Sequence, residues 1–190
     1  IAQGSSELNI SAVIKQSDLQ KGLNALHEAF FLSDNKVLHV FLIGVGLIGK
    51  TLISMIQNQL NKLQEDLMLD IKIHGLANSR FMAFDEDGFN LSSTPVPSKK
   101  DLPMDLQVFL NTMNSMNFSN SVLVDCTASQ EVADTYERVL ESKVAIVTPN
   151  KKANSSSLEK YKSLKKLSGQ RNIKFLYETN VAAGLPVINT

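Results

Sequence analysis

The sequence predicts an α/β fold in which helices cover both faces of a doubly wound parallel sheet. Short apolar, β-branched runs alternate with helical apolar stripes from about residue 36 onward. The first such run ends in a glycine-rich turn, at Gly44. The third, Ser121–Asp125, has an uninterrupted apolar run between its two terminal residues, as expected of a strand buried on both faces.

Composition limits the size and class of the protein. The chain has 190 residues, with 19 basic and 19 acidic side chains and 43% hydrophobic residues. These values fit one domain, or one domain with an appendage, and argue against wholesale disorder. The zero net charge argues against a general nucleic-acid binder.

The cysteine count and the hydropathy pattern indicate in which cellular compartment the protein is found. Cys126 is the single cysteine, which excludes an intrachain disulfide and a Cys-rich metal site. No stretch approaches the roughly 18 apolar residues that span a bilayer. We therefore expect a cytoplasmic protein with no membrane partner.

The first 33 residues form a separate unit. Ile10–Ile14 predicts a strand, and Ser17 or Asp18 can cap a following helix. The apolar stripe of that helix consists of Leu19, Leu23, Leu26 and Phe30. One strand and one helix cannot bury a core, so this unit needs a sheet to join.

A βαβ unit follows. Val37–Ile43 predicts a strand, Leu47–Leu67 a helix and Ile71–Ala77 a second strand, parallel to the first. The predicted inner face of the helix consists of Leu52, Met55, Ile56, Leu60 and Leu63. Asp85–Pro103 is rich in Pro, Ser and Asp and predicts a long surface loop.

The remaining sequence continues the alternation of helices and strands. The predicted elements are a helix at Leu106–Met116, a strand at Ser121–Asp125, a helix at Glu131–Ser142, a strand at Val144–Val147, a helix at Ser157–Ser168 and a strand at Lys174–Tyr177.

The turn after the first strand of this unit carries the pattern G-x-G-x-x-G, in the residues Gly44, Val45, Gly46, Leu47, Ile48 and Gly49. Its position between a strand and a helix predicts dinucleotide binding; the alternative is an ordinary glycine-rich turn. Gly44 allows a tight turn, Gly46 lets the backbone approach a pyrophosphate, and Gly49 lets the helix pack closely. The helix N-terminus then offers free N–H groups to the anion.

The second strand of the unit ends at Asn78, Ser79 and Arg80, where an NAD-preferring fold usually has an acidic residue. Ser79 can donate a hydrogen bond, and Arg80 can pair with a 2′-phosphate. These residues favour NADP over NAD. The alternative is that Arg80 is a solvated surface residue.

Two later strands also end in residues that can carry chemistry. Thr127 follows the third strand and can hydrogen-bond a cofactor, whereas Cys126 has no histidine nearby in sequence and is predicted to be a buried thiol. The histidines His27, His39 and His74 are predicted inside helices or strands. Lys151 can stabilise charge on a bound carbonyl oxygen, whereas Lys152 is predicted to be solvated.

The fifth strand leads into a turn of small residues. Glu178 precedes Gly184 and Pro186, so free carbonyls would lie near a carboxylate, a combination that suits a hard cation. Spacing alone does not establish such a site.

Together these segments resemble homoserine dehydrogenases, and especially those fused to aspartokinase in bacteria and plants. The resemblance rests on GVGLIG, GLANSR, VDCTAS, TPNKKANSSS and YETNVAAGLPVI. IAQGSSELNISAVI resembles the last strand region of an ACT regulatory domain. The resemblance covers nearly the whole chain, and TPNKKA and NVAAGLP are its most specific motifs.

The resemblance implies NAD(P)H-dependent reduction of aspartate 4-semialdehyde to homoserine, with Lys151 as the catalytic residue. It implies that residues 44–49 hold the pyrophosphate, that Arg80 contacts the adenosine ribose, and that Thr127 and Lys151 contact the nicotinamide end. It also implies a sodium ion held by Glu178, Val181, Ala183 and Leu185. Ala182 stands where family members have glycine.

The predicted domains are therefore an ACT remnant over residues 1–33 and a cofactor-binding domain over residues 34–190. The substrate domain of the family would follow residue 190, so we expect this chain to bind cofactor without efficient turnover. We expect the parent protein to be a homo-oligomer that acts on a small-molecule substrate. A regulatory or assembly module is one alternative, and a semialdehyde dehydrogenase that uses Cys126 is another.

Overall fold

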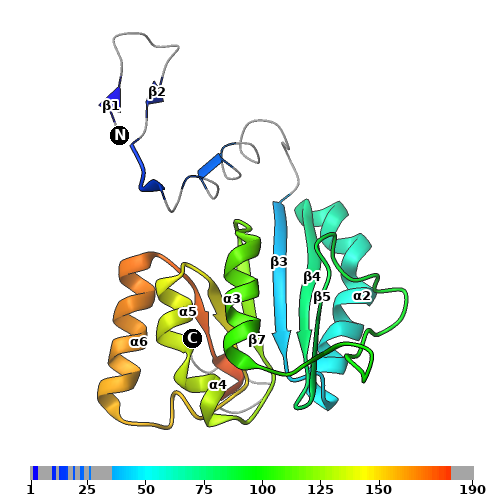
Figure 1. Cartoon of the computed structure of the whole chain (residues 1–190). Coiled ribbons are helices and arrows are strands. Elements are labelled where there is room, and N and C mark those ends of the chain that lie inside the picture. Colours follow the sequence, from blue (N-terminus) through cyan, green and yellow to red (C-terminus); the bar gives the residue numbers. More distant parts are fainter. Residues whose placement is uncertain are drawn as a thin grey trace.

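The computed structural model of the chain describes residues 36–180 and, before them, residues 2, 3, 10, 11, 13–16, 19, 22, 23 and 26. A seven-stranded sheet is the centre of the fold, with strand order β6-β5-β4-β3-β7-β8-β9 (Figure 1). Its strands are β3 (Lys36–Ile43), β4 (Leu69–Ala77), β5 (Phe81–Phe84), β6 (Leu102–Pro103), β7 (Ser121–Asp125), β8 (Ala145–Val147) and β9 (Phe175–Leu176).

The helices are α2 (Leu47–Leu67), α3 (Leu106–Met116), α4 (Gln130–Asp134), α5 (Tyr136–Glu141) and α6 (Leu158–Arg171), followed by the 3-10 turn η2 (Glu178–Asn180). Figure 1 shows α2 on one side of the sheet and α3, α5 and α6 on the other. This arrangement confirms the predicted α/β class with helices on both faces.

The sheet separates two hydrophobic cores, and alternating residues of its central strands point into one core or the other. Phe41 and Ile43 of β3 pack with the α3, α5 and α6 side chains. Val40 and Leu42 point to the opposite face and pack with Ile53 of α2. Ile53 is fully buried and Met55 is exposed, so the predicted inner face of α2 was wrong at this position.

The α2 face is only partly covered at the β8–β9 edge. Ile146 and Phe175 are buried against α5 and α6, whereas Val147 and Leu176, which point the other way, remain 37% and 43% exposed. This uncovered apolar strip borders one of the cavities described below.

Two details of the sheet differ from prediction. β3, β4, β7, β8 and β9 are parallel, but β5 is antiparallel to both β4 and β6, so the sheet is mixed at one edge. The predicted loop over Asp85–Pro103 contains the short strand β6. β5 forms because a tight turn at residues 78–80 reverses the chain directly after β4.

The predicted helix over Glu131–Ser142 is divided at Thr135 into α4 and α5. The Thr135 hydroxyl donates to the Val132 carbonyl oxygen at 2.7 Å. Threonine side chains that bond to the backbone in this way compete with the regular helical pattern and bend helices.

In the N-terminal region, β1 (Ala2–Gln3) and β2 (Ile10–Ser11) form an antiparallel pair. Ile14 approaches Gly22 so closely that a Cβ there would lie 2.8 Å from its Cδ1 atom. Leu19, Leu23 and Leu26 are each about half exposed. The predicted cap residues Ser17 and Asp18, together with His27 and Phe30, lie outside the described residues.

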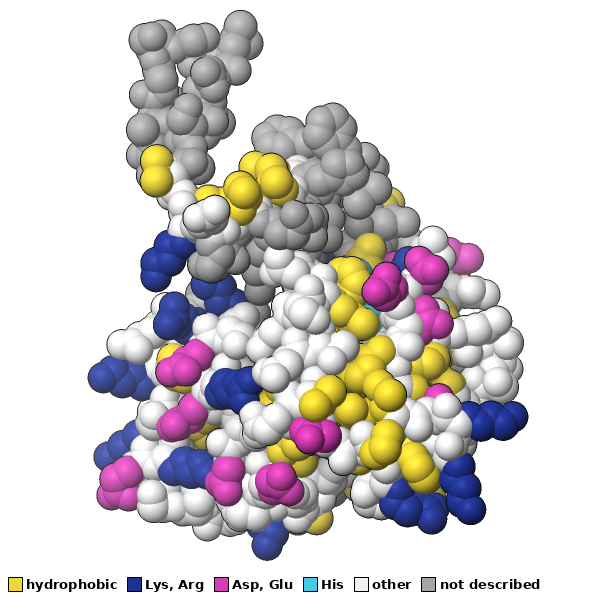
Figure 2. Space-filling view, in the orientation of Figure 1, with side chains coloured by type: hydrophobic (Ala, Val, Ile, Leu, Met, Phe, Trp, Pro, Cys, Tyr) yellow, Lys and Arg dark blue, Asp and Glu magenta, His cyan; other side chains and the backbone are white. Residues whose placement is uncertain are grey.

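Charges of both signs are interspersed on the surface. Figure 2 shows Lys and Arg side chains next to Asp and Glu on the side where Figure 1 places α6. Over the part of the chain that the structure describes, no helix has the length and apolar character needed to cross a membrane.

Candidate functional site

Three adjoining cavities lie at the carboxyl edge of the parallel strands. The largest, about 930 Å³, lies between the ends of β3, β4 and β7. A second, about 450 Å³, shares Thr127 and Ala128 with it and extends to Lys151. A third, about 570 Å³ and mainly apolar, shares Ile48 and Pro149 with the second. Ligands of doubly wound sheets bind at this edge.

The glycine turn has the geometry that the sequence predicts. Gly44 has φ +100°, and a Cβ on it would lie 2.7 Å from the carbonyl carbon of Cys126. A Cβ on Gly49 would lie 2.3 Å from the Gly44 oxygen, because α2 packs directly on the turn. A Cβ on Gly46, by contrast, would meet no atom within 4 Å.

Gly46 is also the N-cap residue of α2, and it provides no side-chain hydrogen bond to the helix. The first turn of α2, which includes Leu47 and Ile48, contains no acidic residue. Free N–H groups and the helix dipole make such a terminus a binding site for a phosphate or pyrophosphate. Val45 and Gly46 line the largest cavity, so the open space before Gly46 belongs to it.

The end of β4 is organised by Asn78. Its Oδ1 accepts from the backbone N–H groups of Arg80 and Phe81 at 2.8 and 2.9 Å. Its Nδ2 donates to the Pro97 carbonyl oxygen at 2.7 Å. Asn78 and Ser79 line the largest cavity, but these bonds occupy the Asn78 side chain in shaping the turn.

Arg80 does not line that cavity. Its side chain is exposed, and its guanidinium carbon lies 5.8 Å from the centre of the Phe81 ring. The structure thus brings Ser79 to the cavity wall and leaves Arg80 at the surface beside it.

The end of β7 brings two predicted residues to the cavities. Thr127 lines the first two cavities, and its Oγ1 accepts from the Ser129 N–H at 3.0 Å. Cys126 is partly buried, and burial, together with the charge of Asp125, raises the pKa of its thiol to about 11. A thiol of this pKa is protonated at neutral pH, which argues against a nucleophilic role.

A buried polar network lies directly behind this edge. Asp125 is fully buried and accepts from the Tyr136 hydroxyl at 2.7 Å, from Asn150 Nδ2 at 2.9 Å and from the Thr127 N–H at 2.8 Å. Burial, followed by the charge of Asp125, raises the pKa of Tyr136. No sequence pattern predicted a role for Asp125, Tyr136 or Asn150, although a carboxylate that closes an apolar strand, as Asp125 does, is a usable signal.

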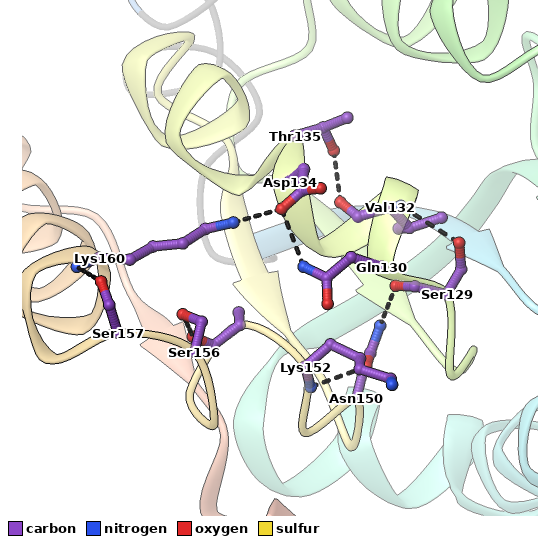
Figure 3. Close-up of polar contacts among 11 residues, drawn as sticks. Ser129, Gln130, Val132, Asp134, Thr135, Asn150, Lys152, Ser156, Ser157 and Lys160 are labelled. Atoms are coloured by element: carbon purple, nitrogen blue, oxygen red, sulfur yellow. Dashed lines mark hydrogen bonds and ion pairs between the residues drawn. The ribbon is translucent and has the colours of Figure 1, made fainter.

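The loop after β8 carries the two predicted lysines. Both are exposed and line the 450 Å³ cavity. The Lys152 N–H donates to Asn150 Oδ1 at 3.1 Å, and Asn150 Nδ2 donates to the Ser129 carbonyl oxygen, as Figure 3 shows. The structure thus places Lys151 and Thr127 around one cavity.

The predicted cation site lies mostly beyond the described residues, since Val181, Ala183 and Leu185 fall outside them. Glu178 and Thr179 belong to η2 and line the apolar cavity. Within residues 36–180 and the described N-terminal positions, no three His, Cys, Asp or Glu side chains are grouped to hold a metal ion.

Comparison with protein families gives two matches. Residues 44–178 match the family model described as homoserine dehydrogenase, NAD binding domain. Residues 1–30 match an ACT domain model.

Curated relatives are similar along the whole chain. A chloroplastic bifunctional aspartokinase/homoserine dehydrogenase of Zea mays is 40% identical over 192 residues, which is 100% of this chain and 21% of the relative. The bifunctional enzyme of Buchnera aphidicola is 41% identical over 100% of this chain and 23% of its own length. The chain therefore spans about a fifth of the length of these relatives.

Solved structures share the fold. A Staphylococcus aureus homoserine dehydrogenase superposes over 77% of this chain and 33% of its own, with a TM-score of 0.55 and 21% identity. A hyperthermophilic archaeal homoserine dehydrogenase in complex with NADPH superposes over 80% of this chain and 47% of its own, with a TM-score of 0.60 and 19% identity.

Proposed function

This chain belongs to the homoserine dehydrogenase family, and we propose that it is the cofactor-binding part of an enzyme that reduces L-aspartate 4-semialdehyde to L-homoserine with NADPH or NADH. The parent would be a bifunctional aspartokinase/homoserine dehydrogenase, as in the relatives from maize and Buchnera.

The observation that carries this proposal is the space in front of Gly46. It is open at the uncapped N-terminus of α2, while the glycines on either side of it are tightly packed. A pyrophosphate fits there because the backbone can approach it without a side chain between. The cavities run from this point to Lys151, so one extended ligand can reach from Ser79 to the loop after β8.

Each candidate residue along this edge would have a separate role in binding or catalysis. The α2 terminus would bind the pyrophosphate, and the Thr127 hydroxyl would hydrogen-bond the nicotinamide ribose. When bound, the reduced nicotinamide would supply a hydride for the aldehyde carbon of the substrate. The Lys151 ammonium would stabilise the negative charge that develops on the aldehyde oxygen and hold a proton close to it.

We propose NADPH as the preferred cofactor. Ser79 lies in the cavity wall where an NAD-preferring fold would have an acidic residue, and the exposed Arg80 beside it can turn toward a 2′-phosphate. An archaeal homoserine dehydrogenase with the same fold has been solved with NADPH. The sodium site at Glu178 remains a prediction from the family resemblance.

Replacing Gly46 tests the cofactor site directly. A Gly46→Ala chain should fold normally, since the new methyl group meets no atom within 4 Å and Gly46 has φ −94°. The methyl group would stand in the path of the pyrophosphate, so we expect NADPH affinity to fall by about tenfold or more in a fluorescence titration.

Gly169→Ala is the matched control. A Cβ at Gly169 also meets no atom within 4 Å, but this residue lies on α6, away from the cavities. It should bind NADPH as the unmodified chain does. Equal NADPH affinity in the Gly46→Ala chain and its control would contradict the proposed site.

A regulatory role is a second candidate, and it is favoured by the ACT match over residues 1–30. Leu19, Leu23 and Leu26 keep about half of their surface exposed, as suits a face that joins further ACT elements in a homo-oligomeric parent. Titration with threonine separates the two roles. Binding of NADPH without threonine would support the cofactor role alone for this chain.

A further inference from the structure

Asn150 connects three loops that leave neighbouring strands. Its Nδ2 donates to Asp125 Oδ2, at the end of β7, and to the Ser129 carbonyl oxygen, both at 2.9 Å. Its backbone oxygen accepts from Asn180 Nδ2, in the turn after β9, at 3.2 Å. Asn150 is 2% exposed, so these bonds are shielded from water.

These bonds fix the backbone on both sides of Lys151. The Asn150 N–H donates to Thr148 Oγ1 at 2.8 Å, and Asn150 Oδ1 accepts from the Lys152 N–H (Figure 3). Lys151 itself is exposed in the cavity that Thr127 also lines. Hydrogen bonds of Asn150 and Lys152 thus fix the backbone on both sides of Lys151, while the Lys151 side chain can reach a ligand.

Only a side-chain amide satisfies this environment. The two groups that face Nδ2 are a carboxylate and a carbonyl, which both accept hydrogen bonds, whereas the Lys152 N–H donates. Asparagine offers two donor hydrogens and an acceptor oxygen in one short group. Aspartate would set two carboxylates against each other and leave buried polar groups without partners, which is unfavourable.

We propose that Asn150 is a positioning residue that holds Lys151 and the Thr127 loop in register around the reacting end of the cofactor. The proposal rests on the cofactor-binding function and adds a residue to it. Since Asn150 acts through Lys151 and Ser129, its loss should affect the nicotinamide half of the ligand and spare the adenosine half.

A pair of ligands separates those halves. NADPH carries the nicotinamide, and 2′-phospho-ADP-ribose lacks it. For Asn150→Asp we expect NADPH affinity to fall about tenfold and 2′-phospho-ADP-ribose affinity to change less than about twofold. A loss of folding would weaken both ligands alike, so the ratio of the two affinities is the readout.

Asn111→Asp is the matched control. Asn111 also uses its side-chain oxygen, which accepts from Arg138 Nη2 at 2.6 Å, but it lies in an exposed contact between α3 and α5. Aspartate keeps that acceptor, so we expect both affinities to stay unchanged.

Reversing the pair provides a rescue. Asp125→Asn alone would face the Asn150 amide with another donor, and Asp125→Asn with Asn150→Asp restores one donor opposite one acceptor. The carboxylate at position 150 would still face the Ser129 carbonyl oxygen, so we expect the double variant to regain only part of the lost NADPH affinity and to bind NADPH at least about threefold more tightly than Asn150→Asp alone, the coupling expected of residues in direct contact.

Several results would overturn the proposal. The first is that Asn150→Asp binds NADPH and 2′-phospho-ADP-ribose as the unmodified chain does. The second is that its affinities for the two ligands fall by the same factor. The third is that it binds neither ligand and that adding Asp125→Asn restores no binding. If the unmodified chain binds NADPH no more tightly than 2′-phospho-ADP-ribose, the positioning role is wrong but the cofactor-binding function stands. If it binds neither ligand, the cofactor-binding function fails and the positioning role fails with it.

Discussion

Arg80 and Ser79 are the residues that we propose to distinguish NADPH from NADH. Ser79 lies in the wall of the largest cavity, while the Arg80 guanidinium lies over the Phe81 ring at the surface. A cation over an aromatic face at an exposed site gains only about 0.5–1 kcal/mol, so the guanidinium can leave the ring for a phosphate at little cost. The planar guanidinium pairs with phosphate through two parallel hydrogen bonds.

Replacing Arg80 should therefore change cofactor preference without changing the fold. For Arg80→Ala we expect NADPH affinity to fall about tenfold and NADH affinity to remain the same, because only NADPH carries the 2′-phosphate. Parallel fluorescence titrations with both cofactors provide the measurement. An unchanged NADPH-to-NADH ratio would show that Arg80 is an ordinary surface residue.

Single residues differed in how well their sequence context revealed them. Gly44 and Gly49 follow from spacing, because local backbone geometry alone demands a small residue there. Asn78 was predicted to bind cofactor and lines the largest cavity, but no local pattern predicted that its side chain also forms the turn. Asn150 and Asp125 contact each other across 25 residues of chain, so no local pattern pointed to their bond.

Strands β3 and β4 share a buried histidine pair. His74 Nδ1 lies 2.9 Å from the Asp85 carbonyl oxygen, which can only accept, so this nitrogen carries the proton. His74 Nε2 therefore accepts from His39 Nδ1, at 2.8 Å. His39 also stacks on Phe118. Burial lowers the pKa of His39 to about 4 and lowers that of His74, so both rings are neutral at pH 7.

This pair predicts acid sensitivity. The pKa of His39 is lower in the folded chain than in the unfolded chain, so the unfolded chain binds the extra proton as pH falls below about 6.5. Stability should therefore be full above that pH and fall by about 3 kcal/mol toward pH 4 on account of His39. Urea unfolding of the chain and of His39→Gln between pH 7 and pH 4 measures this. The glutamine variant should show the shallower loss, and parallel curves would contradict the assignment.

At the level of elements, local patterns predicted long helices and buried strands well. α2, α3 and β7 begin and end where the periodicity places them. β5 was missed because it depends on a turn that Asn78 closes through its side chain. The division at Thr135 was missed because a single hydroxyl-to-carbonyl bond, and no change in hydrophobic pattern, separates α4 from α5.

The parallel arrangement of the sheet explains why the candidate site residues lie at one edge. β3, β4, β7, β8 and β9 run parallel, so their carboxyl ends bring the glycine turn, Ser79, Thr127 and Lys151 to adjoining cavities. These residues lie as many as 107 positions apart in the chain, from Gly44 to Lys151. The parallel arrangement of the strands was predicted from the α/β alternation, and the family resemblance implied the roles of the residues.

We propose that a dinucleotide lies along this edge, from the glycine turn to the loop after β8. NADPH titration of the ¹⁵N-labelled chain, followed by NMR, tests it most directly. We expect amide shifts to change at Gly46, Ser79, Thr127 and Lys151, and to remain constant along the outer face of α6. Changes confined to α6 or to the β5–β6 edge, or no changes at millimolar NADPH, would show that the dinucleotide does not bind along this edge.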